Sequence, residues 1–176
     1  MNKFNFAVLV AGLTLITTVL AADAPKANLQ LTMLTKVNPQ GLALWAITND
    51  ALDDAGNVDG KKVTATQWKA LLEIGKGLEE GGRTLATSNG IIAAPPGAKL
   101  QDEANEGAAK AADVQRYVDA KPAEFRKHAL SLQQTGASVT AAATNRDARK
   151  LSTVSASLDE VCESCHVIFW YPNQKK

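Results

Sequence analysis

A seam of apolar residues in the last part of the sequence restricts the chain to a few kinds of fold. Its members recur at alternating spacings of three and four positions: Leu151, Val154, Leu158, Val161, Cys165 and Ile168. This alternation places them on one face of a helix, in the geometry with which helices pack lengthwise against each other. The seam therefore predicts a long helix whose inner face belongs to a helical bundle.

Two further helical patterns occupy the first half of the chain. The first covers residues 27–52, and its apolar spacing continues through Pro39. We therefore expect one helix kinked at this proline, rather than a new helix that starts there. The second begins with a capping box, Thr64 to Gln67, and ends near Ser88.

The second half of the chain completes the set of helices. Pro122 falls in the first turn of a third long helix, and Asn145 is expected to cap the fourth. An alanine-rich stretch, residues 100–118, predicts a peripheral helix between the second and third. Because strand-type alternation is scarce, we predict an all-α protein. Its arrangement is expected to be an antiparallel up-down-up-down four-helix bundle, with a longer crossover between helices two and three.

Two glycines lie on the inner stripe of the second predicted helix. Gly75 and Gly82 alternate there with Trp68, Leu71, Leu78 and Leu85. A glycine costs a helix about 1 kcal/mol relative to alanine, so its use on a buried stripe needs a reason. The pattern fits either a close helix crossing or a site that leaves room for a flat, wide group. Gly82 is the glycine that we expect to lie beside such a group.

The start of the sequence predicts export. Lys3 precedes an apolar run, residues 4–20, and small residues follow, so we expect a signal peptide of residues 1–21 that is cleaved after Ala21. The run is shorter than the roughly 20 residues that a membrane span needs. No cysteine near the cut offers a site for a lipid anchor, and we expect a periplasmic protein without a membrane anchor.

The mature chain, residues 22–176, is long enough for one domain with its own core. The whole sequence has 19 lysines and arginines and 18 aspartates and glutamates, so loss of Lys3 leaves 18 of each. A balanced charge of this kind is not that of a nucleic-acid-binding protein, and we expect no nucleic-acid partner.

Both cysteines of the chain stand in one short motif, Cys162-Glu163-Ser164-Cys165-His166. C-x-x-C-H is the attachment pattern of c-type haem, in which two thiols bind the porphyrin edge and the histidine reaches the iron. A thioredoxin-like redox pair would need a βαβ setting. Structural zinc would need four ligands, and His128 is the only further histidine. The motif therefore predicts one covalent haem c.

A helical chain with this motif near its end resembles the class II c-type cytochromes, the group of cytochrome c′ and its low-spin Met/His-ligated relatives. The resemblance extends over most of the mature chain. It is carried by Val37-Asn38-Pro39, Leu44-Trp45, Trp68, Gly136, the junction from Ala141-Ala142-Ala143 to Arg146-Asp147, and residues 162–172. It implies that Cys162 and Cys165 are thioether sites and that His166 is the proximal iron ligand. It also implies dimerisation through the first two helices.

One position departs from that family. Many cytochromes c′ carry a basic residue four positions after the proximal histidine, where this chain has Trp170. The departure implies different electrostatics beside the imidazole. We expect the cluster Phe169-Trp170-Tyr171 to cover the haem edge.

The sixth position on the iron separates the expected functions, because axial ligation largely decides between electron transfer and ligand binding. Met33, near the start of the first helix, is the favoured distal ligand. Leu34 or Leu31 would instead block that face and leave the iron five-coordinate, and His128 is a third alternative.

These residues predict an electron carrier that exchanges electrons with redox partner proteins. The alternative is a five-coordinate protein that binds NO or CO. No acid/base pair is positioned by sequence for peroxide cleavage, so we expect no enzyme.

Overall fold

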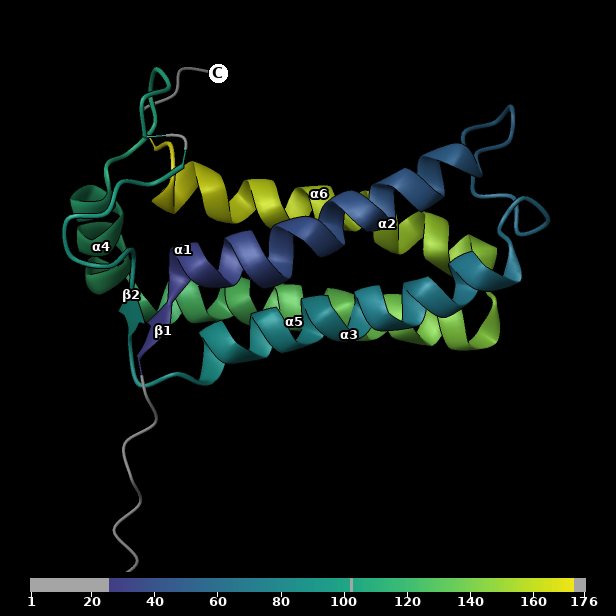
Figure 1. The fold of residues 1–176 in the computed structure, drawn as a ribbon, viewed down its shortest axis with the longest axis horizontal. Coiled ribbons are helices and arrows are strands. Elements are labelled where there is room, and N and C mark those ends of the chain that lie inside the picture. The colour runs from purple at the N-terminus through teal and green to yellow at the C-terminus, as the bar shows by residue number, and fades with distance from the viewer. Residues whose placement is uncertain (1–25, 102, 173–176) are drawn as a thin grey trace, which may run out of the picture.

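Helices make up most of the computed structural model, which describes residues 26–101 and 103–172 (Figure 1). The predicted signal peptide, residues 1–21, lies outside the described residues. In chain order the elements are β1 (Ala27–Asn28), α1 (Leu29–Thr32), the π-helical turn η1 (Met33–Val37), α2 (Asn38–Asp50), α3 (Ala65–Thr87), β2 (Ile91–Ile92), α4 (Ala111–Ala120), α5 (Pro122–Asn145) and α6 (Ala148–Phe169). The prediction of an all-α protein is confirmed at this level, since the two strands are only two residues each.

The long helices lie side by side and share a core (Figure 1). Helix α5 packs extensively against α3 and also against α6, and α2 contacts both α3 and α6. The largest fully buried side chains between them are leucines: Leu44, Leu71, Leu78, Leu85, Leu151 and Leu158. Burial of these side chains is the main stabilising contribution, at roughly 1.5–3 kcal/mol each.

The first helical stretch runs without interruption from Leu29 to Asp50, as the sequence pattern predicts. Asn38 has helical angles, φ −60° and ψ −45°, so no new helix begins at Pro39. The irregularity lies in the turn before the proline, where the Asn38 N–H bonds back to the Met33 carbonyl in π-helical fashion.

The predicted helix ends are right in two cases and wrong in one. Thr64 and Gln67 form the reciprocal capping box of α3, and Pro122 stands in the first turn of α5. Asn145, however, does not cap α6, because it is the last residue of α5. Arg146 then turns the chain with a left-handed φ of 49°, and the Asp147 carboxylate caps α6 by accepting the Lys150 N–H.

The glycines of α3 serve a close helix crossing. A Cβ on Gly75 would lie 2.6 Å from the backbone nitrogen of Thr140, and one on Gly82 would lie 2.8 Å from the carbonyl oxygen of Ala129. Gly136 of α5 is enclosed in the same way, since a Cβ added there would lie 2.7 Å from the Gly75 carbonyl oxygen. The suggestion that Gly82 makes room for a flat group is therefore wrong: backbone of α5 fills that space.

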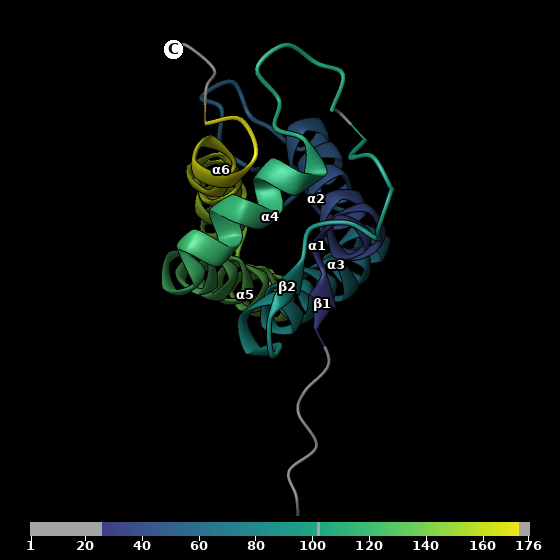
Figure 2. The ribbon, with the colours of Figure 1, turned by 90° about the vertical axis from the view of Figure 1, so that its left-hand side faces the viewer.

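The segment between α3 and α5 closes one end of the molecule. Strand β2 pairs in parallel with β1, and α4 crosses the end of the long helices (Figure 2). The predicted helix over residues 100–118 is shorter than expected, since α4 begins only at Ala111 and turns and a bend occupy residues 103–107. None of the helices in the described ranges is long and apolar enough to span a membrane.

Candidate functional site

The C-terminal half of α6 brings the predicted haem ligands onto one cavity. Cys165 and His166 follow Cys162 by three and four positions, so the three residues lie within about one turn on the same side of the helix. All three side chains are half-buried and line a cavity with a volume of about 290 Å³. This volume is close to the lower end of the roughly 300–1,000 Å³ of ligand pockets.

The other walls of this cavity come from every long helix and from the crossover. Most of its lining residues are apolar, and α1, η1, α3, α4 and α5 contribute Leu29, Met33, Leu34, Val37, Leu78, Leu85, Val114, Phe125, Ala129 and Leu132. A few polar side chains, including Gln30, Asn38, Gln101 and His128, also face it. An apolar pocket with few polar groups is the usual form of a cofactor site.

The residues considered for the sixth position on the iron do not all lie on the cavity. Met33, Leu34 and His128 all line the cavity, together with the cysteines and His166. Leu31 does not line it and is 58 % exposed, so the expectation that Leu31 blocks the distal face is wrong. His128 is engaged by a hydrogen bond between its Nδ1 and the Ser164 hydroxyl, at 3.2 Å.

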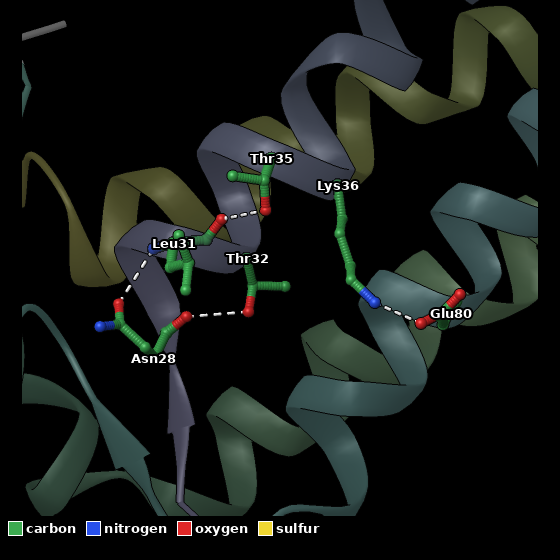
Figure 3. Close-up of polar contacts among 6 residues, drawn as sticks. All are labelled: Asn28, Leu31, Thr32, Thr35, Lys36 and Glu80. Carbon is green, nitrogen blue, oxygen red and sulfur yellow. Dashed lines mark hydrogen bonds and ion pairs between the residues drawn. The ribbon is translucent and has the colours of Figure 1, made fainter.

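Polar contacts hold the helical start that carries Met33 (Figure 3). The Asn28 side chain caps α1 by accepting the Leu31 N–H at 2.9 Å, and the Thr32 hydroxyl donates to the Asn28 carbonyl at 2.8 Å. Beyond Met33, an ion pair joins Lys36 of η1 to Glu80 of α3. The backbone that presents Met33 is thus attached on both sides.

Burial controls the protonation of the motif. It raises the pKa of the Cys162 thiol to about 11, with a further contribution from Asp159, and that of the Cys165 thiol to about 12. Burial also lowers the pKa of His166, against an opposing effect of Glu163. At neutral pH the imidazole is therefore neutral, as a metal ligand must be, and the thiols are protonated.

We expect slow alkylation of these thiols in the folded, haem-free chain. At pH 8 iodoacetamide should react with Cys162 roughly 100-fold more slowly than in the urea-unfolded chain, because only the thiolate reacts and its fraction falls with the raised pKa. The same shift makes the folded state lose stability as pH rises from the ordinary thiol pKa of 9.0 toward 11, since unfolded thiols ionise first. Equal reaction rates in both states would contradict the burial of the motif.

The aromatic cluster after the motif divides into two parts. Phe169 is a core residue, 2 % exposed, and meets Phe125 edge-on at a centroid distance of 5.5 Å. Trp170 and Tyr171 lie against the His166 ring, at centroid distances of 6.2 and 5.7 Å. All three rings line the cavity, and Trp170 and Tyr171 are the two that lie beside the predicted proximal ligand.

Sequence reasoning missed two features of the site. Gln101 and Val114 of the crossover line the cavity, although nothing in their local pattern indicates it. The Tyr171 hydroxyl donates a hydrogen bond to the Glu163 carboxylate, eight positions earlier. Burial, together with this bond, raises the pKa of Tyr171 to about 12, so the hydroxyl stays a donor at neutral pH.

These features define a helical protein with a C-x-x-C-H motif on an apolar cavity. No protein-family model matches the chain, and neither a curated protein nor a solved structure matches it. Within residues 26–101 and 103–172, no three His, Cys, Asp or Glu side chains gather where they could hold a metal ion by themselves.

Proposed function

We propose that the protein is an exported monohaem c-type cytochrome that transfers single electrons between redox partner proteins. The observation that carries this proposal is the meeting of Cys162, Cys165, His166 and Met33 on one apolar cavity. The helix contacts also support the finer fold assignment, an antiparallel up-down-up-down four-helix bundle of the class II c-type cytochrome kind, with residues 88–121 as the longer crossover.

The residues present fit a haem group. Two thiols one helical turn apart match the two attachment points of a porphyrin edge, and a neutral imidazole beside them offers its lone pair to iron. When bound, haem would supply a one-electron iron couple. Cys162 and Cys165 would hold it covalently, His166 would be the proximal ligand, and Met33 would be the distal ligand.

Other residues that line the cavity also have roles in this proposal. Val114 and Leu158 are fully buried and would exclude water from the group, which favours the less charged oxidation state of the iron. The neutral Met33 thioether would raise the reduction potential in the same sense. Both effects suit an electron carrier.

Leu34 favours a second candidate function. It follows Met33 directly and lines the same cavity, so a leucine-covered, five-coordinate iron that binds NO or CO is the alternative. The two candidates differ in whether a sixth ligand from the protein competes with added gas.

The proposal is tested on the full chain, produced with its leader in cells that attach haem c. The intact mass of the exported protein should exceed that of the polypeptide by one haem, and its absorption spectrum should show a c-type haem in both oxidation states. A mass equal to that of the polypeptide would refute the proposed function.

Replacement of Met33 distinguishes the two candidates. In Met33→Ala, the six-coordinate spectrum should give way to one that shifts at once when CO is added to the reduced protein, because the distal thioether is gone. Leu34→Ala and His128→Ala serve as controls and should keep the wild-type spectrum. An immediate CO shift in the wild-type protein would instead support the five-coordinate alternative.

A further inference from the structure

The chain folds back at the end of α6 and lies against His166. Trp170 and Tyr171, which we name the C-terminal strap, both donate their backbone N–H groups to the His166 carbonyl, at 2.8 and 3.0 Å. The Ala109 N–H from the crossover donates in turn to the Trp170 carbonyl, at 2.8 Å. The strap is thus attached to the helix on one side and to the crossover on the other.

A side-chain bond completes this attachment. The Tyr171 hydroxyl donates to Glu163, whose carboxylate lies one helical turn before His166. Residues three apart on a helix are neighbours on its surface, so Glu163 and His166 are within reach of each other. Glu163 is also the charged group that influences the pKa of His166.

This arrangement matters because a histidine that binds a metal usually donates its second ring N–H to a carboxylate or carbonyl, which makes it a stronger ligand. Among the described residues no partner hydrogen-bonds to the His166 ring. The carboxylate on the preceding turn is instead engaged by Tyr171. The bond to Tyr171 therefore fixes where the Glu163 carboxylate lies relative to the His166 ring.

We propose that Tyr171 is a positioning residue that holds Glu163 away from the His166 ring and so keeps the imidazole a weaker iron ligand. The inference rests on the proposed function and extends it to the control of reduction potential. A carboxylate bonded to the imidazole would favour ferric iron, because it adds negative charge through the ligand. The tyrosine prevents this and maintains a higher potential.

A double-mutant cycle tests the proposal on the haem-loaded protein. Tyr171→Phe should lower the reduction potential, because the freed Glu163 then accepts the His166 ring N–H. In the Glu163→Gln background the same tyrosine substitution should leave the potential unchanged, since no carboxylate at position 163 remains to bond to the His166 ring. Glu160→Gln, which removes an exposed carboxylate elsewhere on α6, controls for the loss of one charge.

A structural role alone would give a different result. If Tyr171 only holds the strap over the haem, Tyr171→Phe should shift the potential by the same amount with Glu163 or with Gln at that position. That outcome, or an unchanged potential in Tyr171→Phe, would overturn the inference and leave the proposed function intact. A chain that attaches no haem would overturn both.

Hydrogen exchange of the haem-free chain provides a second measurement. Loss of the Tyr171 to Glu163 bond should speed exchange of the Trp170 and Tyr171 amides about fivefold in both Tyr171→Phe and Glu163→Ala, since neither variant retains both the donor and the acceptor. Glu160→Gln should leave these rates at the wild-type value. Unchanged exchange in Tyr171→Phe would show that the bond does not hold the strap, and the inference would be wrong.

Discussion

When Cys162 and Cys165 are both replaced by alanine, protein produced in cells that attach haem c should contain no covalently bound haem. The two thiols are the only cysteines in the sequence, so no other residue of the chain can form a thioether. Denaturing gels stained for haem peroxidase activity, together with intact mass, should show a complete loss relative to wild type. Each single replacement should leave at most one thioether and a reduced yield of stained protein.

The matched control for this experiment is Ser164→Ala. Ser164 lies between the cysteines and is exposed, and its replacement removes the bond to His128 but no thiol. It should therefore retain the haem mass of the wild-type protein. Haem that survives denaturation in the double cysteine variant would contradict the assignment of the motif.

The second large effect is expected at the crossing of α3 and α5. Gly136→Ala should lower the free energy of unfolding by about 3 kcal/mol, because the added Cβ has no free space. It would lie 2.7 Å from the Gly75 carbonyl oxygen and 2.8 Å from the Glu79 Cα. These atoms are backbone and cannot move aside without separating the helices. Urea unfolding measures the change.

Gly41→Ala is the matched control for this substitution. Gly41 is also a buried helical glycine, but its added Cβ would meet side-chain atoms of Trp45 and Leu158 at 3.7 and 3.8 Å, an ordinary contact distance. Its unfolding free energy should stay equal or rise by up to about 1 kcal/mol, from the higher helix propensity of alanine. Equal stabilities of the two variants would argue against the close crossing.

Local patterns in the sequence predict the helices because local interactions form them. The capping box at Thr64 needs only a partner three residues later, and Pro122 suits a first helical turn wherever the helix lies. Apolar spacing likewise selects the buried face, so Leu151, Val154 and Leu158 are buried as predicted. These features are decided within one or two turns of the chain.

The predictions that were wrong concern residues whose surroundings come from other parts of the chain. Asn145 and Asp147 are both good cap residues, and the left-handed turn at Arg146 decides between them. Gly82 and Leu31 sit on helix faces whose neighbours come from elsewhere in the chain. The backbone of α5 covers Gly82, while Leu31 remains largely exposed.

The sequence by itself determined the residue types and spacing of this protein's motif and its helical character. Thiol and imidazole spacing and apolar periodicity are properties of neighbouring residues, so they can be read without coordinates. Only the tertiary structure decided which distant groups face the motif: Met33 from η1, Val114 from α4, and Tyr171 folded back onto Glu163. These contacts depend on how the helices pack, on the path of the crossover and on the reversal of the chain after α6. Each of these depends on the whole core rather than on a local pattern.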